Sequence, residues 1–571
     1  MKYSAEYELW LKNAVGDKEL TEELLAIKGQ EEEIADRFYC ELKFGTAGLR
    51  GVLGAGTNRM NIYTVGKATQ GLADFLNDNY DAPSVAIAYD SRIKSDLFAR
   101  EAASILAANN VKVFLFKELV PTPVLSYAIR YFKTSSGIII TASHNPSKYN
   151  GFKCYNPNGF QMTDDEADKT YDCISKIDCF KDIKKYDFEQ GIAAGMIEYI
   201  GDDVLESFLD CVQSQCVNPD ACANAELEVI YTPLNGTGNK PVRKILDRIG
   251  IKKVHIVPEQ EYPDGKFPTC PYPNPEIEQA FEYALKMTAQ TPADLLLATD
   301  PDCDRVGIAV PDRDGRYRLM SGNEVGVMLL NYLLSQRSEK GTMPENPIAV
   351  KTIVSTDLTA AVAKKYNCEL KDLLTGFKYI GEVVTELEEK GQSDRFILGF
   401  EESYGYLCGT HARDKDAVVA SMLICEMASF YKLRGKSLLE VMEDIYNEFG
   451  MYLNVVESFT FEGESGMEKM REIMDTLRRT PPLHFGGEQV LSFADYEIGE
   501  RRDLVTGQIE TISLPKSNVL SFKMNNSNGV IVRPSGTEPK IKAYITATGS
   551  SREEAQKKAD VLLAYVKKFM E

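Results

Sequence analysis

Short apolar runs alternate with amphipathic stretches through the first three quarters of the chain. Residues 85–89 and 137–141 are almost entirely apolar, as buried strands are, whereas residues 99–109 and 126–132 have the spacing of helices. Strands that alternate with helices in this way form parallel sheets with helical crossover connections. The pattern therefore predicts an α/β fold.

The strand and helix pattern starts again twice. A second set of strand-like runs lies at residues 227–231, 253–257 and 294–299, and a third set begins with residues 348–353 and 396–400. No repeated sequence accompanies these restarts, so the three sets resemble one another in architecture only. We expect three similar α/β domains.

Both ends of the chain differ from this pattern. The first forty residues have apolar side chains at helical spacing among charges, and five glycines between residues 45 and 56 predict a loop. After about residue 451 the chain has short strand-like runs and ends in a helix over residues 552–570, which is typical of an α+β domain. These runs are 490–492, 509–514, 519–523, 529–533 and 541–546.

These changes of pattern divide the chain into a helical extension and four domains. We expect the extension at residues 1–40, the three α/β domains at 41–205, 206–318 and 319–450, and the α+β domain at 451–571. In α/β folds, ligands bind beyond the carboxyl ends of the strands. The polar segments that follow predicted strands are therefore the places to look for chemistry.

Composition restricts the partners of the chain. There are 85 acidic and 65 basic residues, and a net charge of −20 repels nucleic acid and anionic membranes. No run of about 20 apolar residues offers a membrane helix, and the N-terminal stretch lacks the pattern of a secretory signal. The 12 cysteines include no C-x-x-C pair, which argues against a zinc site or a disulfide framework. We expect a cytoplasmic protein with reduced thiols.

Ser143 lies in the polar turn 141–146, directly after a predicted strand. A serine on a sharp turn at a strand end is exposed, as a nucleophile or phosphate carrier requires, and Lys153 follows within reach of the same loop. A hydrolytic triad is disfavoured because the G-x-S-x-G elbow is absent. An ordinary turn explains this segment, taken alone, equally well.

Three aspartates, Asp300, Asp302 and Asp304, follow the predicted strand 294–299. Alternate residues of an extended chain share a face, so three carboxylates at this spacing repel one another unless a cation lies between them. Hard oxygen ligands suit Mg²⁺, and the glycine and glutamate that an EF-hand needs are missing. The alternative is a polar loop with three exposed acids.

Two further segments offer groups for a sugar phosphate. Glu401 and Ser403 follow the run 396–400 and can form hydrogen bonds with hydroxyl groups, although a capping segment has the same composition. Residues 533–540 combine an arginine, two hydroxyls, a glycine and a lysine, which suits a phosphate, with a hairpin turn as the alternative. No Walker A loop is present in the sequence.

Together these segments supply the parts that phosphoryl transfer requires. They are a hydroxyl carrier, a carboxylate trio for a cation, a group that recognises hydroxyls and a phosphate cradle, each after a strand of a different expected domain. A carrier, a cation that offsets charge and groups that orient the acceptor oxygen are the components of such a site.

Four motifs in this order resemble those of the α-D-phosphohexomutase superfamily. They are Thr-Ala-Ser-His-Asn-Pro at 141–146, Asp-Pro-Asp-x-Asp-Arg at 300–305, Gly-x-Glu-Glu-Ser at 399–403 and Arg-Pro-Ser-Gly-Thr-Glu-Pro at 533–539. The length, the Phe-Gly-Thr-Ala-Gly-Leu-Arg run at 44–50 and the helical extension are most similar to the longer phosphoglucomutase/phosphopentomutase branch. The resemblance implies three similar mixed-sheet α/β domains and a C-terminal α+β domain around a central cleft.

The resemblance also implies roles for individual residues. Ser143 would be phosphorylated and, with Asp300, Asp302 and Asp304, would hold one Mg²⁺ per chain. Arg50, His144 and Lys153 would serve the phosphoserine and proton transfer, with Lys153 as the hypothetical general base. The residues implied to contact the substrate are Arg305, Thr375, Gly376, Glu401, Ser403, Lys415, Arg533, Ser535, Gly536 and Thr537.

The implied reaction interconverts α-D-glucose 1-phosphate and glucose 6-phosphate, which is the activity of a phosphoglucomutase. Ser143 would give its phosphoryl group to the sugar, glucose 1,6-bisphosphate would be the intermediate and activator, and the other phosphate would return to Ser143. The partners would be small hexose phosphates, and the chain would be a monomer or a weak homodimer.

Several alternatives stay open. Phosphopentomutase, phosphomannomutase and glucose 1,6-bisphosphate synthase share the implied mechanism, and Phe377, where glucose-specific relatives often carry tryptophan, does not decide among them. A phosphatase is disfavoured because it must admit water, whereas a cleft formed by four segments suits the exclusion of water. A kinase is disfavoured because it would need a nucleotide loop, and the sequence has none. A non-catalytic sugar-phosphate binder would be favoured if Ser143 or the aspartates were replaced, and they are intact.

Overall fold

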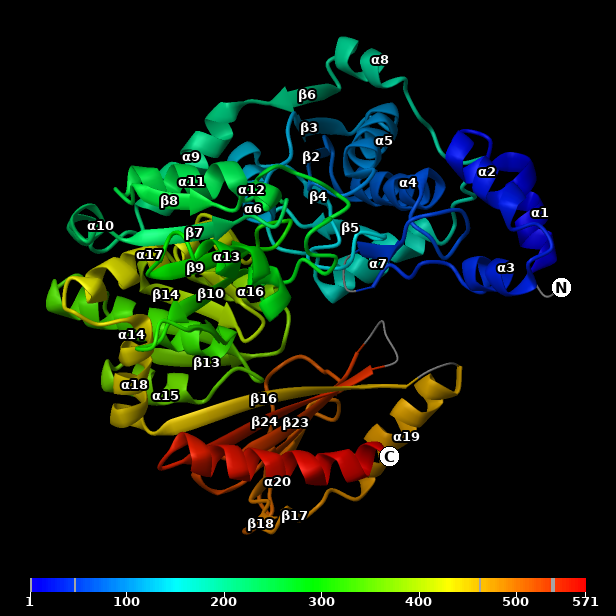
Figure 1. Ribbon diagram of the computed structural model, residues 1–571. Coiled ribbons are helices and arrows are strands. Elements are labelled where there is room, and N and C mark those ends of the chain that lie inside the picture. Colours follow the sequence, from blue (N-terminus) through cyan, green and yellow to red (C-terminus); the bar gives the residue numbers. More distant parts are fainter. Residues whose placement is uncertain (1–2, 46–47, 462–463, 536–539) are drawn as a thin grey trace. The chain divides into compact units, whose positions relative to one another are not determined.

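The computed structural model describes residues 3–45, 48–461, 464–535 and 540–571. The chain divides into two compact units, whose helices and strands are labelled in Figure 1. Unit 1 contains Met1–Ser321, Ile380–Phe396 and Ser403–Ser437, and unit 2 contains Gly322–Tyr379, Ile397–Glu402 and Leu438–Glu571. Within the described ranges, no helix has the length and apolar character needed to cross a membrane.

Three short helices open unit 1, namely α1 (Ser4–Asn13), α2 (Lys18–Ala26) and α3 (Glu31–Phe38). The Asp17 side chain caps α2 by accepting two backbone N–H groups. The three helices share a small core around Trp10, which also makes edge-to-face contacts with Tyr63 and Phe180. The predicted helical character of the first forty residues is confirmed.

A six-stranded mixed sheet follows in unit 1, in the order β1-β5-β4-β2-β3-β6. Its central strands are parallel, whereas β5 pairs antiparallel with both β1 and β4. In chain order the strands are β1 (Gly48–Val52), β2 (Ser84–Tyr89), β3 (Lys112–Phe116), β4 (Ser136–Ile140), β5 (Tyr149–Tyr155) and β6 (Ile197–Ile200). The helices are α4 (Ile62–Asn79), α5 (Ser95–Ala108), α6 (Thr122–Phe132), α7 (Asp164–Ile174), α8 (Phe188–Ala193), α9 (Asp202–Gln213) and α10 (Pro219–Asn224).

Strand β1 corrects the prediction of a loop at residues 45–56. A Cβ atom at Gly48 would lie 2.1 Å from the carbonyl oxygen of Phe152 in β5, and one at Gly51 would lie 2.8 Å from the side chain of Leu42. These glycines therefore allow close approach of β1 to its neighbours rather than a turn.

The second sheet of unit 1 has five strands in the order β11-β10-β9-β7-β8. β7 is parallel to β8 and β9, while β9, β10 and β11 are antiparallel. The strands are β7 (Glu228–Thr232), β8 (Lys253–Ile256), β9 (Leu295–Thr299), β10 (Val306–Pro311) and β11 (Tyr317–Met320). The helices are α11 (Asn239–Arg248), α12 (Pro258–Glu261), η1 (Glu278–Phe281) and α13 (Glu282–Met287).

The later segments of unit 1 hold strand β15 (Gly405–Leu407), helix α17 (Ala417–Lys432), the 3₁₀ turn η2 (Ser393–Arg395) and most of α16 (Phe377–Glu389). Helix α17 packs on α9, α10 and α11. It begins after Asp416, whose carboxylate accepts the backbone N–H groups of Val418 and Val419 and also pairs with His411 at 2.8 Å. This cap fixes the segment just before it, which carries Lys415.

Unit 2 contains a third α/β layer, in which β12 (Ile348–Thr352) lies between β13 (Glu369–Leu373) and β14 (Phe396–Glu401). The strand pair β12–β13 is parallel, as the sequence pattern predicts. The helices of this layer are α14 (Gly322–Glu339), α15 (Leu358–Lys365) and α18 (Leu438–Phe449).

The C-terminal part of unit 2 is built on a seven-stranded sheet in the order β16-β24-β23-β22-β19-β20-β21. Helix α20 packs on its long strands β16 and β24. The elements are β16 (Met451–Thr460), α19 (Glu464–Arg479), β17 (His484–Phe485), β18 (Glu488–Gln489), β19 (Ser492–Asp495), β20 (Glu500–Asp503), β21 (Ile509–Thr511), β22 (Leu520–Lys523), η3 (Asn525–Ser527), β23 (Gly529–Pro534), β24 (Lys540–Gly549) and α20 (Arg552–Met570). The predicted strand at 509–514 is shorter than expected.

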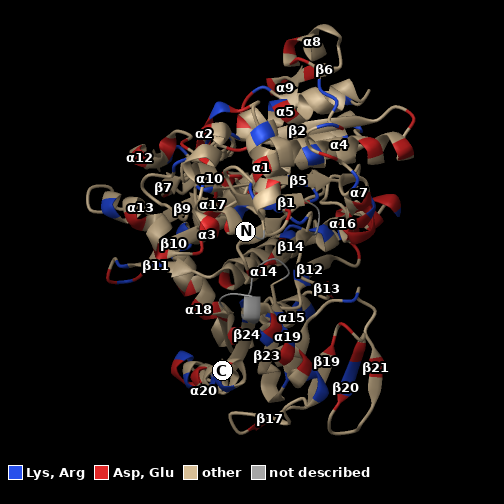
Figure 2. Ribbon diagram, turned by 90° about the vertical axis from the view of Figure 1, so that its right-hand side faces the viewer, with Lys and Arg blue, Asp and Glu red and all other residues tan. Residues whose placement is uncertain are grey.

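These layers confirm the predicted fold class of three mixed-sheet α/β layers and a C-terminal α+β layer. The first two sheets are mixed because the chain reverses direction after β4 and after β9, so that β5 and β10 run antiparallel to them. The pattern of apolar runs does not predict this reversal. Acidic and basic residues are interspersed on the outer helices rather than separated by sign (Figure 2).

Candidate functional site

Ser143 lies in the turn between β4 and β5, with a left-handed backbone φ of 52°. Its N–H donates to the Thr141 hydroxyl at 2.8 Å, which fixes the turn. A non-glycine residue in this conformation is strained, and such strain concentrates at functional sites. The side chain is buried, in contrast to the expected exposure, and its hydroxyl donates to Asp300 Oδ2 at 2.9 Å.

Arg92 holds this turn by its backbone, a role that the sequence analysis missed. Its guanidinium donates to the carbonyl oxygens of Pro146 and Tyr149, both at 3.0 Å, and to those of Ser143 and Asn145. Asp90 pairs with the same side chain at 3.3 Å. Arg92 comes just after β2, so the rule that functional residues follow the carboxyl ends of strands also indicates it.

Asp300, Asp302 and Asp304 lie in the turn between β9 and β10, and one carboxylate oxygen from each lies within 4.8 Å of the others. The predicted convergence is therefore found, but the predicted extended geometry is wrong. Cys303 has a left-handed φ of 50°, and Asp300 Oδ1 accepts the backbone N–H groups of Asp304 and Arg305. A tight turn brings the carboxylates together.

The three carboxylates are fully buried and interact strongly. Burial raises the pKa of Asp300 well above its ordinary value, and the charges of Asp302 and Asp304 raise it further. Burial and the Asp302 charge also raise the pKa of Asp304. Burial acts in the same direction on Asp302, but Lys153, a hydrogen bond with Asp300 and the charge of Lys415 together hold the pKa of Asp302 below its usual range. Lys153, Lys415 and Arg305 therefore offset only part of the effect of burial and mutual repulsion, because the pKa of Asp300 and that of Asp304 stay raised.

The donor set fits a metal ion. Asp302 Oδ1 and Asp304 Oδ1 are buried and have no hydrogen-bond donor within the described part of the chain. Buried carboxylate oxygens normally have a partner, and oxygen ligands of this kind suit Mg²⁺ or a similar hard cation. The residues present could therefore hold a metal ion beside the Ser143 hydroxyl.

Two lysines contact the aspartates from different elements. Lys153 in β5 lies 3.2 Å from Asp302 Oδ2, and Lys415 lies 3.0 Å from Asp304 Oδ2. Thr122, at the start of α6, donates its hydroxyl to Asp302 at 3.1 Å and was missed because its place depends on tertiary structure. The predicted residues Lys153 and Lys415 are therefore both brought to the carboxylates.

A buried chain of contacts links the elements that carry the two lysines. Tyr155, two residues after Lys153 in β5, donates its hydroxyl to Asp414 at 2.7 Å. Asp414 in turn accepts the ammonium group of Lys415 at 3.0 Å. Asp414 and Tyr155 therefore orient Lys415 toward Asp304.

We expect Tyr155→Phe to lower turnover about tenfold and stability by about 1–3 kcal/mol, because Asp414 loses a buried donor and Lys415 its fixed position. The measurements are the turnover number kcat and the midpoint of thermal unfolding. Tyr231→Phe is the matched control, since it removes another buried hydroxyl contact, to Thr299 at 2.9 Å, without touching a lysine. Equal kcat losses in both variants would assign Tyr155 a merely structural role.

Three further predicted residues lie near the turn. His144 Nδ1 is 3.2 Å from Ser143 Oγ, and burial together with the charges of Arg305 and Arg50 lowers the pKa of His144 well below its ordinary value. A neutral His144 follows at pH 7. Arg305 donates to Glu276 at 2.8 Å and to the Ser403 carbonyl at 3.0 Å, and Arg50 is exposed on β1.

The remaining predicted residues that the structure describes belong to unit 2, apart from Ser403. The Gly376 N–H donates to Glu401 Oε1 at 2.9 Å, which places the 375–376 loop beside that carboxylate. Burial, and after it the charge of Glu402, raises the pKa of Tyr544 above its ordinary value. The charge of Arg533 and a hydrogen bond with it act in the opposite direction, and the charge of Glu401 adds a smaller upward effect. Glu401 and Arg533 therefore lie around the same tyrosine.

Arg533 and Ser535 also line a cavity of about 510 Å³ in unit 2, together with Arg471 and Arg478. Asp475 and Glu497 line the same cavity and pair with Arg478, so three arginines face two acids and a small excess of positive charge is left for an anion. The predicted Gly536 and Thr537 lie outside the described residues, and Phe377 is buried.

Four models of one family match this chain in order. Their descriptions are Phosphoglucomutase/phosphomannomutase, alpha/beta/alpha domain I at residues 41–180, domain II at 206–315, domain III at 321–449, and C-terminal domain at 503–564. These matches follow the order of the layers described above.

Curated relatives agree with these family matches, and solved structures share the fold. A phosphoglucomutase of Staphylococcus saprophyticus is 37% identical over 538 residues, which is 94% of this chain and 96% of that protein. The crystal structure of a candidate phosphomannomutase from Thermus thermophilus aligns with a TM-score of 0.68, 22% identity and coverage of 93% and 99%. The phosphoglucomutase parafusin of Paramecium aligns with a TM-score of 0.65, 18% identity and coverage of 93% and 95%.

Proposed function

Because this chain belongs to the phosphoglucomutase/phosphomannomutase family, we propose that it interconverts α-D-glucose 1-phosphate and glucose 6-phosphate through a phosphorylated Ser143. Family membership makes it an intramolecular phosphotransferase. The observation that carries the proposal is the contact of the Ser143 hydroxyl with Asp300 at 2.9 Å, inside a cluster of three convergent carboxylates.

The proposed cycle uses Ser143 as a carrier. Its phosphoryl group passes to the free hydroxyl of glucose 1-phosphate, and the resulting glucose 1,6-bisphosphate returns its other phosphoryl group to Ser143. One bond between phosphorus and oxygen forms and one breaks in each half-reaction. Arg92 keeps the carrier oxygen in place during both halves because it binds the backbone of the turn.

Asp300, Asp302 and Asp304 would hold one Mg²⁺ per chain next to the Ser143 phosphate. Bound there, the ion would supply positive charge against the phosphoryl oxygens. Lys415 supplies positive charge at Asp304, and Lys153, which contacts Asp302, would take the proton of the acceptor hydroxyl as the proposed general base. Neutral His144 is placed to donate or accept a hydrogen bond at the Ser143 oxygen, and Arg50 and Arg305 add positive charge around it.

We propose that Glu401 and Ser403 bind sugar hydroxyls with the loop at Thr375 and Gly376. Support comes from the hydrogen bond between Gly376 and Glu401. Arg533, Ser535, Gly536 and Thr537 would hold the phosphate that is not transferred, and the arginine-lined cavity at Arg533 supports this role. The chain would not need to distinguish the two phosphates of the bisphosphate.

The test of the proposed function compares kcat/KM for glucose 1-phosphate, mannose 1-phosphate and ribose 1-phosphate in one preparation. We expect glucose 1-phosphate to be preferred at least about tenfold, and EDTA to remove turnover until Mg²⁺ is restored. A higher kcat/KM for ribose 1-phosphate or mannose 1-phosphate would make the chain a phosphopentomutase or a phosphomannomutase instead. Net accumulation of glucose 1,6-bisphosphate would favour a synthase.

Lys153→Met tests the proposed general base. We expect turnover to fall about 10²–10⁴-fold while substrate binding stays measurable, because proton transfer is lost and the hydrogen-bonded partner Asp302 stays in place. Lys148→Met is a suitable control, since this lysine is exposed on the same turn. Turnover close to the wild-type rate in Lys153→Met would exclude the role.

The division into domains at 41–205, 206–318, 319–450 and 451–571, after an extension at 1–40, stays part of the proposal. A monomer or weak homodimer and a cytoplasmic location stay predictions from the sequence.

A further inference from the structure

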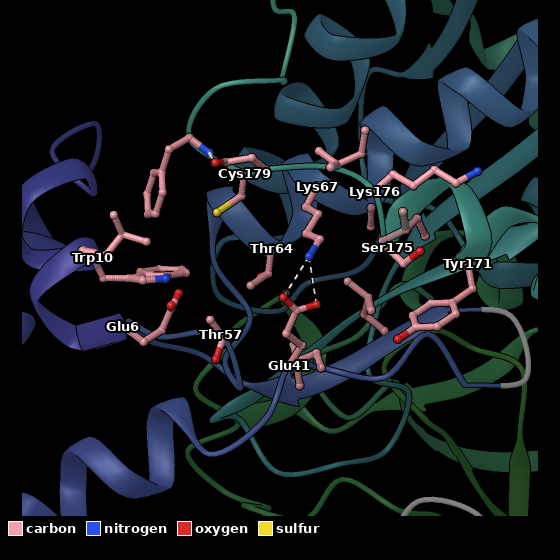
Figure 3. Close-up of a pocket in the computed structure, with 18 residues that line it drawn as sticks. Glu6, Trp10, Glu41, Thr57, Thr64, Lys67, Tyr171, Ser175, Lys176 and Cys179 are labelled. Carbon is pink, nitrogen blue, oxygen red and sulfur yellow. Dashed lines mark hydrogen bonds and ion pairs between the residues drawn. The ribbon is translucent and has the colours of Figure 1, made fainter. Parts of the chain in front are cut away.

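A cavity of about 380 Å³ lies between the N-terminal helices and the first sheet of unit 1 (Figure 3). Its walls come from α1, the segment around β1, helix α4, and the end of α7 with the residues that follow it. None of the residues assigned above to catalysis, metal binding or substrate binding lines it. Small-molecule sites in proteins have volumes of about 300–1,000 Å³.

The walls combine apolar side chains with charged and hydroxyl-bearing ones. Leu9, Leu42, Leu49, Ile174 and Phe180 contribute apolar surface. Across the middle, Lys67 Nζ contacts both carboxylate oxygens of Glu41 at 2.9 and 2.8 Å (Figure 3). A concave site whose walls are partly apolar and partly charged suits a small amphipathic molecule.

At the Trp10 end of the cavity, the described residues of the walls carry one negative charge without a paired positive charge. Glu41 neutralises Lys67, and Asp178 pairs with Lys181 at 2.6 Å. Glu6 forms no ion pair within the residues that the structure describes, and it lies at the Trp10 end, whereas Lys176 extends away from that end (Figure 3). This end therefore keeps one uncompensated carboxylate in a partly apolar setting, which favours a positively charged group.

Cys179 contributes its thiol to the same end of the cavity (Figure 3). Burial raises the pKa of Cys179 to about 12, and the charges of Asp178, Glu41 and Glu6 act in the same direction against that of Lys67. The thiol therefore stays protonated and is a poor nucleophile. A molecule in this cavity would be held without a covalent bond.

Strand β1 contributes to the cavity wall and pairs with strand β5, which carries Lys153. Leu49 lines the cavity, and Arg50, the next residue of the strand, points to the opposite face. In the pairing of β1 with β5, Gly48 lies opposite Lys153. A molecule that presses on Leu49 therefore acts on the strand that carries Arg50 and is bonded to the strand that carries Lys153.

We propose that this cavity binds a small organic ammonium ion with an apolar body, its charge toward Glu6, and that its occupancy changes turnover through strand β1. The binding stands on the cavity itself. The effect on turnover rests on the proposed function.

Trp10 makes a direct test practical, because it is the single tryptophan of the chain and lines the cavity. The probe is 2-phenylethylammonium, titrated into the full-length protein and followed by tryptophan fluorescence and by calorimetry. The neutral control ligand is 2-phenylethanol. The variants are Glu6→Gln and, as a matched control on an exposed position of the same helix, Glu8→Gln.

We expect saturable binding of the amine to the wild type and to Glu8→Gln, and about tenfold weaker binding both of the alcohol and to Glu6→Gln. Turnover should change with the same half-saturating concentration, and that concentration should rise about tenfold in Glu6→Gln. Absence of saturable binding, or equal binding by Glu6→Gln or by the alcohol, would overturn the site.

Binding with unchanged turnover would overturn the coupling through β1. If the amine binds as expected but no sugar phosphate is converted under any condition, the proposed function fails and the site stands.

Discussion

Ser143→Ala is expected to reduce mutase turnover at least about 10³-fold, because it removes the only oxygen that the proposed cycle uses as a carrier. The fold should persist. Arg92 holds the turn through backbone carbonyl groups, which the substitution leaves in place, and alanine and serine meet a similar penalty at a φ of 52°.

Mass spectrometry provides the second measurement on this variant. Purified wild-type protein should carry about +80 Da on the peptide that contains Ser143, as expected for one phosphoryl group. Ser147→Ala, on the same turn, is the control and should keep both the phosphate and the turnover. Turnover in Ser143→Ala close to the control, or phosphate on another residue, would contradict the proposed carrier.

The second large effect is expected for Asp300→Asn, which should lower turnover at least about 10³-fold by weakening the proposed metal site. Asparagine keeps the oxygen that accepts the N–H groups of Asp304 and Arg305, so the turn can stay closed. It also removes a carboxyl group whose pKa is raised by burial and then by the charges of Asp302 and Asp304, so that its ionised form is unfavourable in the folded metal-free protein.

The metal-free variant should therefore melt at or above the temperature of the metal-free wild type, although it is inactive. Thermal unfolding with and without Mg²⁺ separates the two effects, since only the wild type should gain stability from the ion. Asp314→Asn, on the exposed β10–β11 turn, is the control. A variant that still gains the full stability from Mg²⁺ would show that Asp300 does not hold it.

The sequence predicts the fold class well where apolar runs are unbroken. Strands such as β4 and β9 are fully buried, and continuous apolar runs are the signature of buried strands. Strand β5 was not predicted, since Tyr149–Tyr155 mixes polar and apolar residues without strict alternation. The glycines around strand β1 predict a loop, but in the fold they serve close packing of a strand.

The candidate site could be predicted only in part, because local patterns identify chemistry but not partners. The motifs indicate Ser143 and the aspartates, yet Thr122 reaches Asp302 from 180 residues away in sequence. Tyr155 and Asp414 are separated by 259 residues. Contacts over such distances depend on how helices and strands pack, and a single sequence carries no signal for them.

The backbone hydrogen bonds of Arg92 affect which substitutions the turn can tolerate during evolution. The guanidinium recognises carbonyl oxygens, which every amino acid possesses, and ignores the side chains that the turn displays. Turn positions whose side chains take no part in the site, such as Ser147 and Lys148, can therefore change identity while the Ser143 hydroxyl keeps its place. Selection for substrate specificity can act at such positions without moving the Ser143 hydroxyl.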